Sequence, residues 1–299
     1  DTGIDYLYPD LIGRVDLSRS ASFIPEDDAD VDTYFPGRDY VTDLHWHGTH
    51  VATAAVSNAF LFAGVTSRVT LMGVKVCSWQ GGCPGSAIFA GIMHAVENRA
   101  DVINMSLGGY FQKRQYPGFV SVINRIFNHA RSRGVTIVVS AGNESVDLDH
   151  IGDWYKTYCD APNAICVSAT GPTARLSAVD WENVDAPADY TNFGRSAISV
   201  AAPGGNSGDP DNWVPGPCST SSLEIPPCQS GLFLLSAAGT SQAAPHVSAL
   251  AALMVEDHGR NPGRVKAMIQ ESADDLGQPG VDPWYGKGRI NVATAVGAN

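Results

Sequence analysis

A serine, a histidine and an aspartate stand in three separate motifs of this chain. Ser241 lies in GTSQAAPHV, among small residues at the start of an apolar stretch. A serine hydroxyl is a poor nucleophile at neutral pH; it needs a base, and the base needs a group that orients it. His47, in HWHGTHV, precedes a glycine at a predicted helix start, and Asp1, in DTGID, lies at a predicted turn. The order Asp, His, Ser, each at the tip of a separate element, is one that a catalytic triad on an α/β sheet could have.

Apolar segments of strand and helix character alternate along the chain. The predicted strands are 69–76, 101–107, 135–141, 164–169, 197–202 and 231–237, the predicted helices between them are 86–100 and 119–134, and the predicted loops are 25–45, 143–162, 171–192 and 203–230. Strands that are apolar throughout and alternate with helices indicate a parallel sheet covered on both faces. We therefore predict a three-layer α/β fold with a mostly parallel central sheet, in a single domain over residues 1–299.

The stretches that follow His47 and Ser241 are apolar on nearly all sides. Helices without a polar face are buried, so both stretches are predicted as central helices. Pro245 lies within the second stretch, and we expect a kink or an irregular first turn there.

The composition indicates an acidic globular protein. Of the 299 residues, 44% are hydrophobic, and the net charge is −12. Nucleic-acid-binding proteins carry basic surfaces and anionic membranes attract basic ones, so this charge argues against both partners. No apolar run of the sequence reaches the roughly 18 residues that a membrane-spanning helix needs. We expect a monomer.

Six cysteines occur as three close pairs. These are Cys77 with Cys83, Cys159 with Cys166, and Cys218 with Cys228. Six cysteines have fifteen connectivities; pairing nearest neighbours is the simplest, because each pair flanks a loop-like segment. Six free thiols in a cytosolic protein are the alternative. Since disulfides favour an oxidising compartment, we expect a secreted, extracellular protein.

The same motifs, with two more, are similar to the signature segments of one enzyme family. DTGID, HGTHVA and GTSQAAPHV resemble the catalytic blocks of the subtilisin-like serine proteases. INMSLGG at 103–109 resembles the strand that lines the family's substrate cleft, and VVSAGN at 138–143 resembles the segment with its oxyanion asparagine; DYTNFG and VAAPG are weaker matches. The segments follow the family's order over nearly the whole chain. The resemblance implies a subtilisin-like fold and an endopeptidase that acts on protein or peptide substrates through an acyl-enzyme on Ser241.

The resemblance also assigns a role to each residue of the site. Ser241 would attack the peptide carbonyl, His47 would take the serine proton and return it to the leaving amine, and Asp1 would orient His47. Asn143 would donate its side-chain amide to the oxyanion. The implied substrate-binding residues are Ser106, Leu107, Gly108 and Gly109 on a strand that pairs with the substrate backbone, and Ser140, Ala141 and Gly142 on another wall of the specificity pocket.

Two groups of side chains suggest metal sites. His45, His47 and His50 could bind zinc, since imidazole is a common zinc ligand, although the HGTH spacing fits the family and no HExxH pattern is present. Residues 26–32, EDDADVD, supply carboxylates of the kind that calcium takes, and members of the family often bind calcium; a solvated acidic loop is the commoner explanation. We expect no cofactor in the chemistry and no metal at the catalytic site, and we leave a structural calcium ion unassigned.

The main departure from the family lies at Asp1. Family members have a buried apolar strand before this aspartate, whereas here nothing precedes it. We expect the natural chain to extend upstream, where it could carry a propeptide; otherwise the amine of Asp1 could pair with its own carboxylate and draw it from His47. The departure motivates a second hypothesis, a catalytically silent relative that binds peptides in the same cleft. A histidine-rich metal protein is a third.

Substrate specificity rests on the segment 144–159, which we expect to shape one wall of the specificity pocket. Its acidic residues suggest basic substrate side chains, but a solvated loop explains these residues equally well.

Overall fold

The chain divides into two compact units, and each is described by itself. The structure is a computed structural model that describes residues 1–156 and 158–298. The first unit comprises residues 1–100 and 215–235, and the second comprises residues 101–214 and 236–299. A single domain over residues 1–299 therefore stays a prediction.

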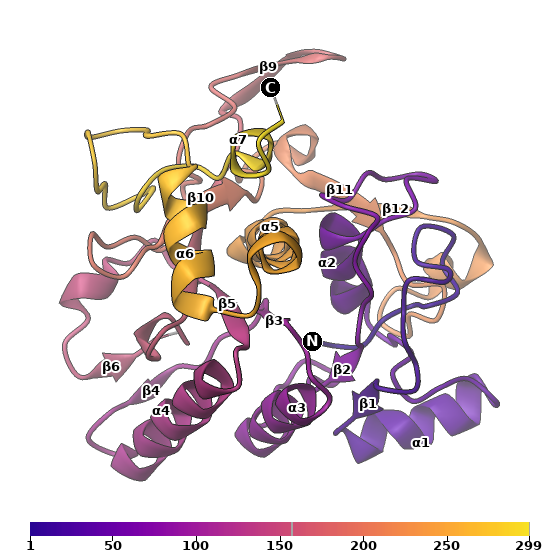
Figure 1. The fold of residues 1–299 in the computed structure, drawn as a ribbon. Helices are drawn as coiled ribbons and strands as arrows, with labels where there is room; N and C mark the ends of the chain where they lie inside the picture. Colours follow the sequence, from indigo (N-terminus) through magenta and orange to yellow (C-terminus); the bar gives the residue numbers. More distant parts are fainter. Residues whose placement is uncertain (157, 299) are drawn as a thin grey trace. The chain divides into compact units, whose positions relative to one another are not determined.

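A four-stranded parallel sheet forms the centre of the second unit (Figure 1). Its strands, in spatial order, are β10 (Val200–Pro203), β7 (Ile165–Thr170), β5 (Thr136–Ser140) and β3 (Val102–Met105). β5 and β7 are buried along their whole length, as strands covered on both faces are. β3 and β5 lie within segments predicted as strands, β7 and β10 extend one residue beyond theirs, and the mostly parallel sheet is confirmed.

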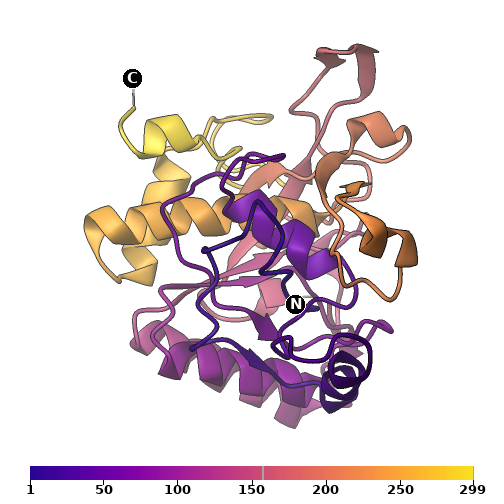
Figure 2. The same ribbon diagram turned by 90° about the vertical axis from the view of Figure 1, so that its right-hand side faces the viewer.

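Helices cover this sheet on both faces. The buried helix α5 (Thr240–His258) packs against all four strands, and α6 (Pro262–Glu271) packs against α5. The amphipathic helix α4 (Pro117–Ser132) contacts β5 from the other side, so the strands lie between α5 and α4 in both views (Figures 1 and 2). Three layers result, as predicted.

The side chains that join α5 to the sheet are aliphatic. Val247, Leu250 and Met254 are fully buried and share one cluster with Val138 and Val167 of the strands. Each fully buried side chain of this kind contributes about 1.5–3 kcal/mol. This packing fixes the N-terminal end of α5, where Ser241 lies, relative to β3 and β5.

Within residues 1–100, the first unit contains three α-helices and one pair of short parallel strands. The helices are α1 (Pro25–Tyr34), α2 (His47–Ala55) and α3 (Gly85–Glu97), and the strands are β1 (Ala21–Ser22) and β2 (Val74–Lys75). Of the strand predicted over 69–76, only β2 forms.

The prediction of a loop over 25–45 is wrong for its first ten residues, which form α1. Pro25 occupies the first turn of α1, where its missing N–H costs nothing. Glu26, Asp27 and Asp28 follow in the same turn, where negative charge is stabilised by the helix dipole. The acidic residues 26–28 thus belong to the first turn of a helix, although their composition is typical of a loop.

Residues 215–235 are held in the first unit by hydrogen bonds to its early segments. The amide of Leu223 donates to the carbonyl of Leu44 at 2.7 Å. Thr220 donates to the carboxylate of Asp5 through its amide at 2.8 Å and its hydroxyl at 2.6 Å.

All three nearest-neighbour disulfides are confirmed. They join Cys77 to Cys83, Cys159 to Cys166, and Cys218 to Cys228.

The remaining elements are short. They are the antiparallel pair β4 (Phe111–Gln112) and β6 (Trp154–Tyr155), the hairpin β8 (Ala174–Ser177) and β9 (Asp180–Glu182), the pair β11 (Val214–Pro217) and β12 (Leu234–Ala237), the helix α7 (Val292–Ala295), and the 3-10 helices η1 (Leu148–His150), η2 (Tyr158–Asp160), η3 (Pro210–Asn212) and η4 (Pro226–Ser230). Within the part of the chain that the structure describes, no helix is both long and apolar enough to span a bilayer.

Candidate active site

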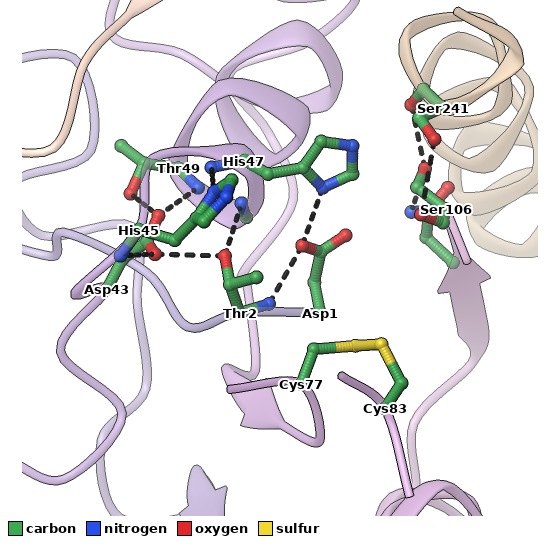
Figure 3. Close-up of polar contacts among 12 residues, drawn as sticks. Asp1, Thr2, Asp43, His45, His47, Thr49, Cys77, Cys83, Ser106 and Ser241 are labelled. Atoms are coloured by element: carbon green, nitrogen blue, oxygen red, sulfur yellow. Dashed lines mark hydrogen bonds and ion pairs between the residues drawn. A yellow bond between two sulfur atoms is a disulfide. The ribbon is translucent and has the colours of Figure 1, made fainter. Parts of the chain in front are cut away.

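In the first unit, the carboxylate of Asp1 binds the ring of His47 (Figure 3). Nδ1 of His47, the first residue of α2, lies 2.8 Å from Oδ1 of Asp1, and the two side chains are 19% and 18% exposed. The amide of Thr2 donates to the same carboxylate oxygen at 2.8 Å. A carboxylate only accepts hydrogen bonds, so Nδ1 carries the proton and Nε2 keeps a free lone pair.

The amine of Asp1 does not draw this carboxylate away. It donates to the carbonyl of Val74 at 3.2 Å, whereas the carboxylate binds His47.

Burial keeps His47 in its neutral form. Removal of the ring from water lowers the pKa of His47 to about 4. The negative charge of Asp43 opposes this shift but is outweighed. A neutral imidazole at neutral pH can accept a proton, which is the property that a general base needs.

A buried carboxylate, Asp43, organises the turn that leads into α2. It accepts hydrogen bonds from the hydroxyl of Thr2 at 2.9 Å, the amide of His45 at 3.0 Å, and the amide and hydroxyl of Thr49 at 2.9 and 2.6 Å (Figure 3). Asp43 was not among the predicted site residues, because it lies in the segment predicted as a loop. Its position four residues before His47, beside a helix start, was the available signal, since carboxylates are common there.

A glycine permits the close approach of α2 to the segment after Asp1. A Cβ atom at Gly48 would lie 2.1 Å from the carbonyl oxygen of Gly3, closer than any real contact. Because Gly48 has no side chain, the start of α2 can lie against the backbone of Gly3, and His47 is thereby placed beside Asp1.

The three histidines of this segment have different neighbours. Nδ1 of His45 accepts from the amide of His47 at 3.2 Å, and its Nε2 pairs with Glu224. His50 is fully buried, and its ring fills the space where a side chain at Gly216 would lie. Among residues 1–156 and 158–298, no group of three histidine, cysteine or acidic side chains is arranged to hold a metal ion.

The acidic side chains of 26–32 also have separate partners. Asp27 accepts from the hydroxyl of Ser78 at 2.8 Å and lies 3.6 Å from the ammonium of Lys75, and Asp30 accepts from Nε1 of Trp79 at 2.7 Å. Both carboxylates are thus engaged by donors of residues 78–79, and within the described residues they belong to no group arranged to hold a metal ion.

In the second unit, Ser241 is the second residue of α5 and is joined to Ser106 by two hydrogen bonds (Figure 3). Oγ of Ser241 donates to the carbonyl of Ser106 at 3.2 Å, and Oγ of Ser106 donates to the carbonyl of Ser241 at 2.7 Å. The first bond is long for a hydroxyl donor, so the proton of Ser241 is weakly held.

Pro245 explains the second of these bonds. In a regular helix the amide of residue 245 would donate to the carbonyl of Ser241, four residues earlier. Proline has no N–H, and the hydroxyl of Ser106 supplies the missing donor. The helix continues through Pro245 without interruption, and a kink at this position stays a prediction.

The side chain of Asn143 is fixed with its amide nitrogen free. Oδ1 of Asn143 accepts from both the amide and the hydroxyl of Thr240 at 2.9 Å. These two donors fix the oxygen end of the side chain, so Nδ2 is the end left to donate. Thr240 immediately precedes Ser241, and this coupling keeps a neutral donor beside the serine.

A pocket of about 440 Å³ opens beside Ser241 and Asn143. It is lined by Leu107, Gly108, Gly109, Tyr110, Ser140, Gly142, Asn143, Glu144, Lys156, Thr240 and Ser241. Of the other residues expected to bind substrate, Ser106 contacts Ser241, and Ala141 is fully buried. Four lining residues were not predicted as site residues: Tyr110, Glu144, Lys156 and Thr240. Glu144 and Lys156 belong to the segment 144–159, which was expected to form a wall of the pocket.

Comparisons with known proteins agree with one another. The model of the Subtilase family matches residues 1–288. The subtilisin of Bacillus pumilus is 30% identical over 300 residues, which cover 99% of this chain and 88% of that protein. The thermophilic serine proteinase of Bacillus sp. (strain AK1) is 29% identical over 299 residues, and the chain covers only 60% of its length. The crystal structure of a lanthipeptide protease superposes with a TM-score of 0.78 at 25% identity, over 99% of this chain and 85% of that one.

Proposed function

Since the chain belongs to the subtilase family, we propose that it is a serine endopeptidase whose nucleophile is Ser241, with His47 as general base and Asp1 as the group that orients it. The observation that carries this proposal is the 2.8 Å hydrogen bond between Nδ1 of His47 and Asp1, which leaves Nε2 as the only ring atom able to take a proton.

The first half of the reaction forms the acyl-enzyme. Oγ of Ser241 attacks the substrate carbonyl carbon while its proton passes to Nε2 of His47, and the carbonyl oxygen becomes negative. The carboxylate of Asp1 stabilises the imidazolium that forms. The carbon–nitrogen bond then breaks, and the same proton passes from His47 to the leaving amine.

Asn143 stabilises the negative oxygen in both halves of the reaction. Its amide Nδ2 and the backbone N–H of Ser241 are the proposed donors, and the N-terminus of α5 adds a favourable dipole. In the second half, water attacks the acyl carbon while one of its protons passes to His47. The bond from this carbon to Oγ of Ser241 then breaks, and His47 returns the proton to Oγ, which regenerates the serine.

The proposed substrates are proteins or peptides, and every group in the proposed chemistry belongs to the protein chain or the substrate or is water. The names of the relatives, a serine proteinase, a subtilisin and a lanthipeptide protease, support this substrate class. The three disulfides support an extracellular location, because such bonds persist in oxidising compartments.

A fluorophosphonate probe tests the proposal on the full-length gene product. We expect the probe to label Ser241, and Ser241→Ala to abolish labelling and reduce peptide hydrolysis by at least about 10⁴-fold. Ser132→Ala is the matched control, because Ser132 is exposed at the end of α4 and its hydroxyl donates to the carbonyl of His129 in the same helix. Peptide binding without labelling or hydrolysis would show a catalytically silent relative and would refute the proposal.

A further inference from the structure

Two charged residues, Glu144 and Lys156, are among the side chains that line the pocket beside Ser241. A residue whose carbonyl is attacked by Ser241, the P1 residue of a substrate, has its side chain next to that carbonyl. The pocket is therefore where the P1 side chain goes, and the orientation of the two charges decides which side chains it accepts.

Lys156 runs along the pocket wall. Its carbonyl oxygen lies 3.8 Å from where a Cβ atom of Gly108 would be, and its ammonium lies 4.7 Å from the ring centre of Tyr110. Gly108 and Tyr110 both line the pocket, so the backbone carbonyl and the ammonium of Lys156 each lie beside a lining residue. The ring contact is a cation–π interaction, which leaves the donors of the ammonium free for an anion.

The neighbouring elements hold Lys156 in this place. β4 pairs with β6 so that Phe111 lies opposite Tyr155, which puts Tyr110 and Lys156 at the next position of the same ladder. The ring of Tyr110 stacks on Trp154 with ring centres 4.4 Å apart. The wall is thus built from a paired strand and a stacked aromatic ring rather than from an isolated surface lysine.

The carboxylate of Glu144 is turned away from the pocket. Its Oε2 accepts from Nδ2 of Asn192 at 2.5 Å, and Asn192 is a fully buried residue that does not line the pocket. Asn192 also accepts from the amide of Glu144 at 3.2 Å, so the residue is held at two points. Glu144 is exposed, and water screens its charge.

We propose that Lys156 selects substrates with a carboxylate side chain, Asp or Glu, at P1 and disfavours Lys and Arg there. The inference rests on the proposed peptidase function and deepens it. It runs opposite to the suggestion of basic substrates that the acidic residues of 144–159 gave. The structure turns Glu144 toward Asn192, whereas Lys156 lines the pocket with its ammonium over the ring of Tyr110, another lining residue.

Peptides that differ only at P1 test the inference with the full-length gene product. Glu and Gln have nearly the same shape, so the ratio of their kcat/KM values measures the effect of charge alone. We expect P1 Glu to be preferred over P1 Gln by about tenfold at low salt, and less at high salt because ions screen the pair. P1 Lys should be the poorest of the three.

Two variants and a matched control assign the preference to Lys156. Lys156→Gln should bring the Glu-to-Gln ratio close to one, and Lys156→Glu should make P1 Lys the preferred residue. Lys113→Gln removes the same charge from a lysine that pairs with Asp160 outside the pocket lining, and it should leave the ratio unchanged.

The outcomes separate this inference from the proposed function. Labelling of Ser241 by a fluorophosphonate with a Glu-to-Gln ratio near one, or with a preference for P1 Lys or Arg, would overturn the role of Lys156 and leave the peptidase standing. A ratio that Lys156→Gln does not change would overturn it equally. Should the Lys156 variants not fold, the ratio in the unmodified protein and its decrease with salt decide. Absence of both labelling and cleavage would remove the peptidase function and this inference together.

Discussion

Asn143 shows how one side chain can be committed to a single orientation. Both donors of Thr240 hold its oxygen, so its amide nitrogen is fixed as the donor. We predict that Asn143→Ala lowers kcat by about 10²–10³-fold with little change in KM, the loss known for the oxyanion asparagine of a subtilisin. Steady-state kinetics on a peptide substrate measure it.

The Thr240 hydroxyl provides the control for this prediction. Thr240→Val removes one of the two donors to Asn143 and should lower kcat less than Asn143→Ala does. Thr240→Ser keeps the hydroxyl and should retain activity. Equal activity in Thr240→Val and Thr240→Ser would show that this hydrogen bond does not position Asn143.

The lowered pKa of His47 predicts the acid side of the pH profile. Because burial lowers this pKa from 6.5 to about 4, the neutral base persists below the pH at which a free imidazole is half protonated. We expect kcat/KM to fall as pH decreases, with an apparent pKa below 6.5. An apparent pKa at or above 6.5 would show that the Asp1 carboxylate outweighs burial.

The same shift affects folding stability. Between pH 6.5 and about 4 the unfolded chain binds more protons at His47 than the folded chain does. The free energy of unfolding should therefore decrease as pH is lowered through this range. Urea titrations of Ser241→Ala measure it without self-cleavage, and His47→Gln should flatten this part of the dependence.

Among the elements, α5 tolerates a proline inside its first turns because β3 is followed by a serine. The hydroxyl of Ser106 supplies the donor that Pro245 lacks, and it also accepts from Nδ2 of Asn104 at 3.0 Å. We predict that Ser106→Ala destabilises the fold by about 1–2 kcal/mol, since it leaves the carbonyl of Ser241 without a donor.

A double-mutant cycle with Pro245→Ala tests this explanation. Alanine restores an amide that can donate to the carbonyl of Ser241, so Ser106→Ala should cost less in the Pro245→Ala background than alone. Urea unfolding in the Ser241→Ala background measures all four proteins, with Ser132→Ala as the exposed serine control. Additive losses would mean that Ser106 and Pro245 act independently.

The sequence predicted the long apolar elements well and the short polar ones poorly. The four strands of the central sheet and the helices α3, α4 and α5 follow from runs of aliphatic residues, whose burial decides their conformation. α1 was missed because its acidic residues are typical of loops by composition, while Pro25 and the position of the charges favour a helix start.

In the candidate site too, some residues could be predicted from the sequence and others could not. Asp1, His47, Ser241 and Asn143 stand in motifs that a resemblance could identify. Lys156 and Tyr110 are brought together by the pairing of β4 with β6. These are two-residue strands far apart in the chain, and no local sequence pattern predicts that they pair. The direction of Glu144 depends on Asn192, which the sequence does not connect to it.

For the molecule as a whole, the disulfide between Cys218 and Cys228 closes the segment that completes the first unit. Its ten-residue separation corresponds to about 3 kcal/mol on the chain-entropy account. We predict that Cys218→Ser combined with Cys228→Ser lowers the free energy of unfolding by about this amount, measured by urea titration. Cys77→Ser with Cys83→Ser is the comparison, because its six-residue separation predicts about 2 kcal/mol. No loss in the first variant would mean that the hydrogen bonds of Thr220 and Leu223 hold the segment alone.

The placement of residues 215–235 in the first unit has a consequence for how the protein is made. The first hundred residues are synthesised before Thr220 and Leu223. The hydrogen bonds from Thr220 to the carboxylate of Asp5 and from Leu223 to the carbonyl of Leu44 therefore cannot form until residues 101–214 have been translated. A nascent chain that stalls in that interval carries an incomplete unit with exposed apolar surface, and it is a natural client for chaperones or for degradation.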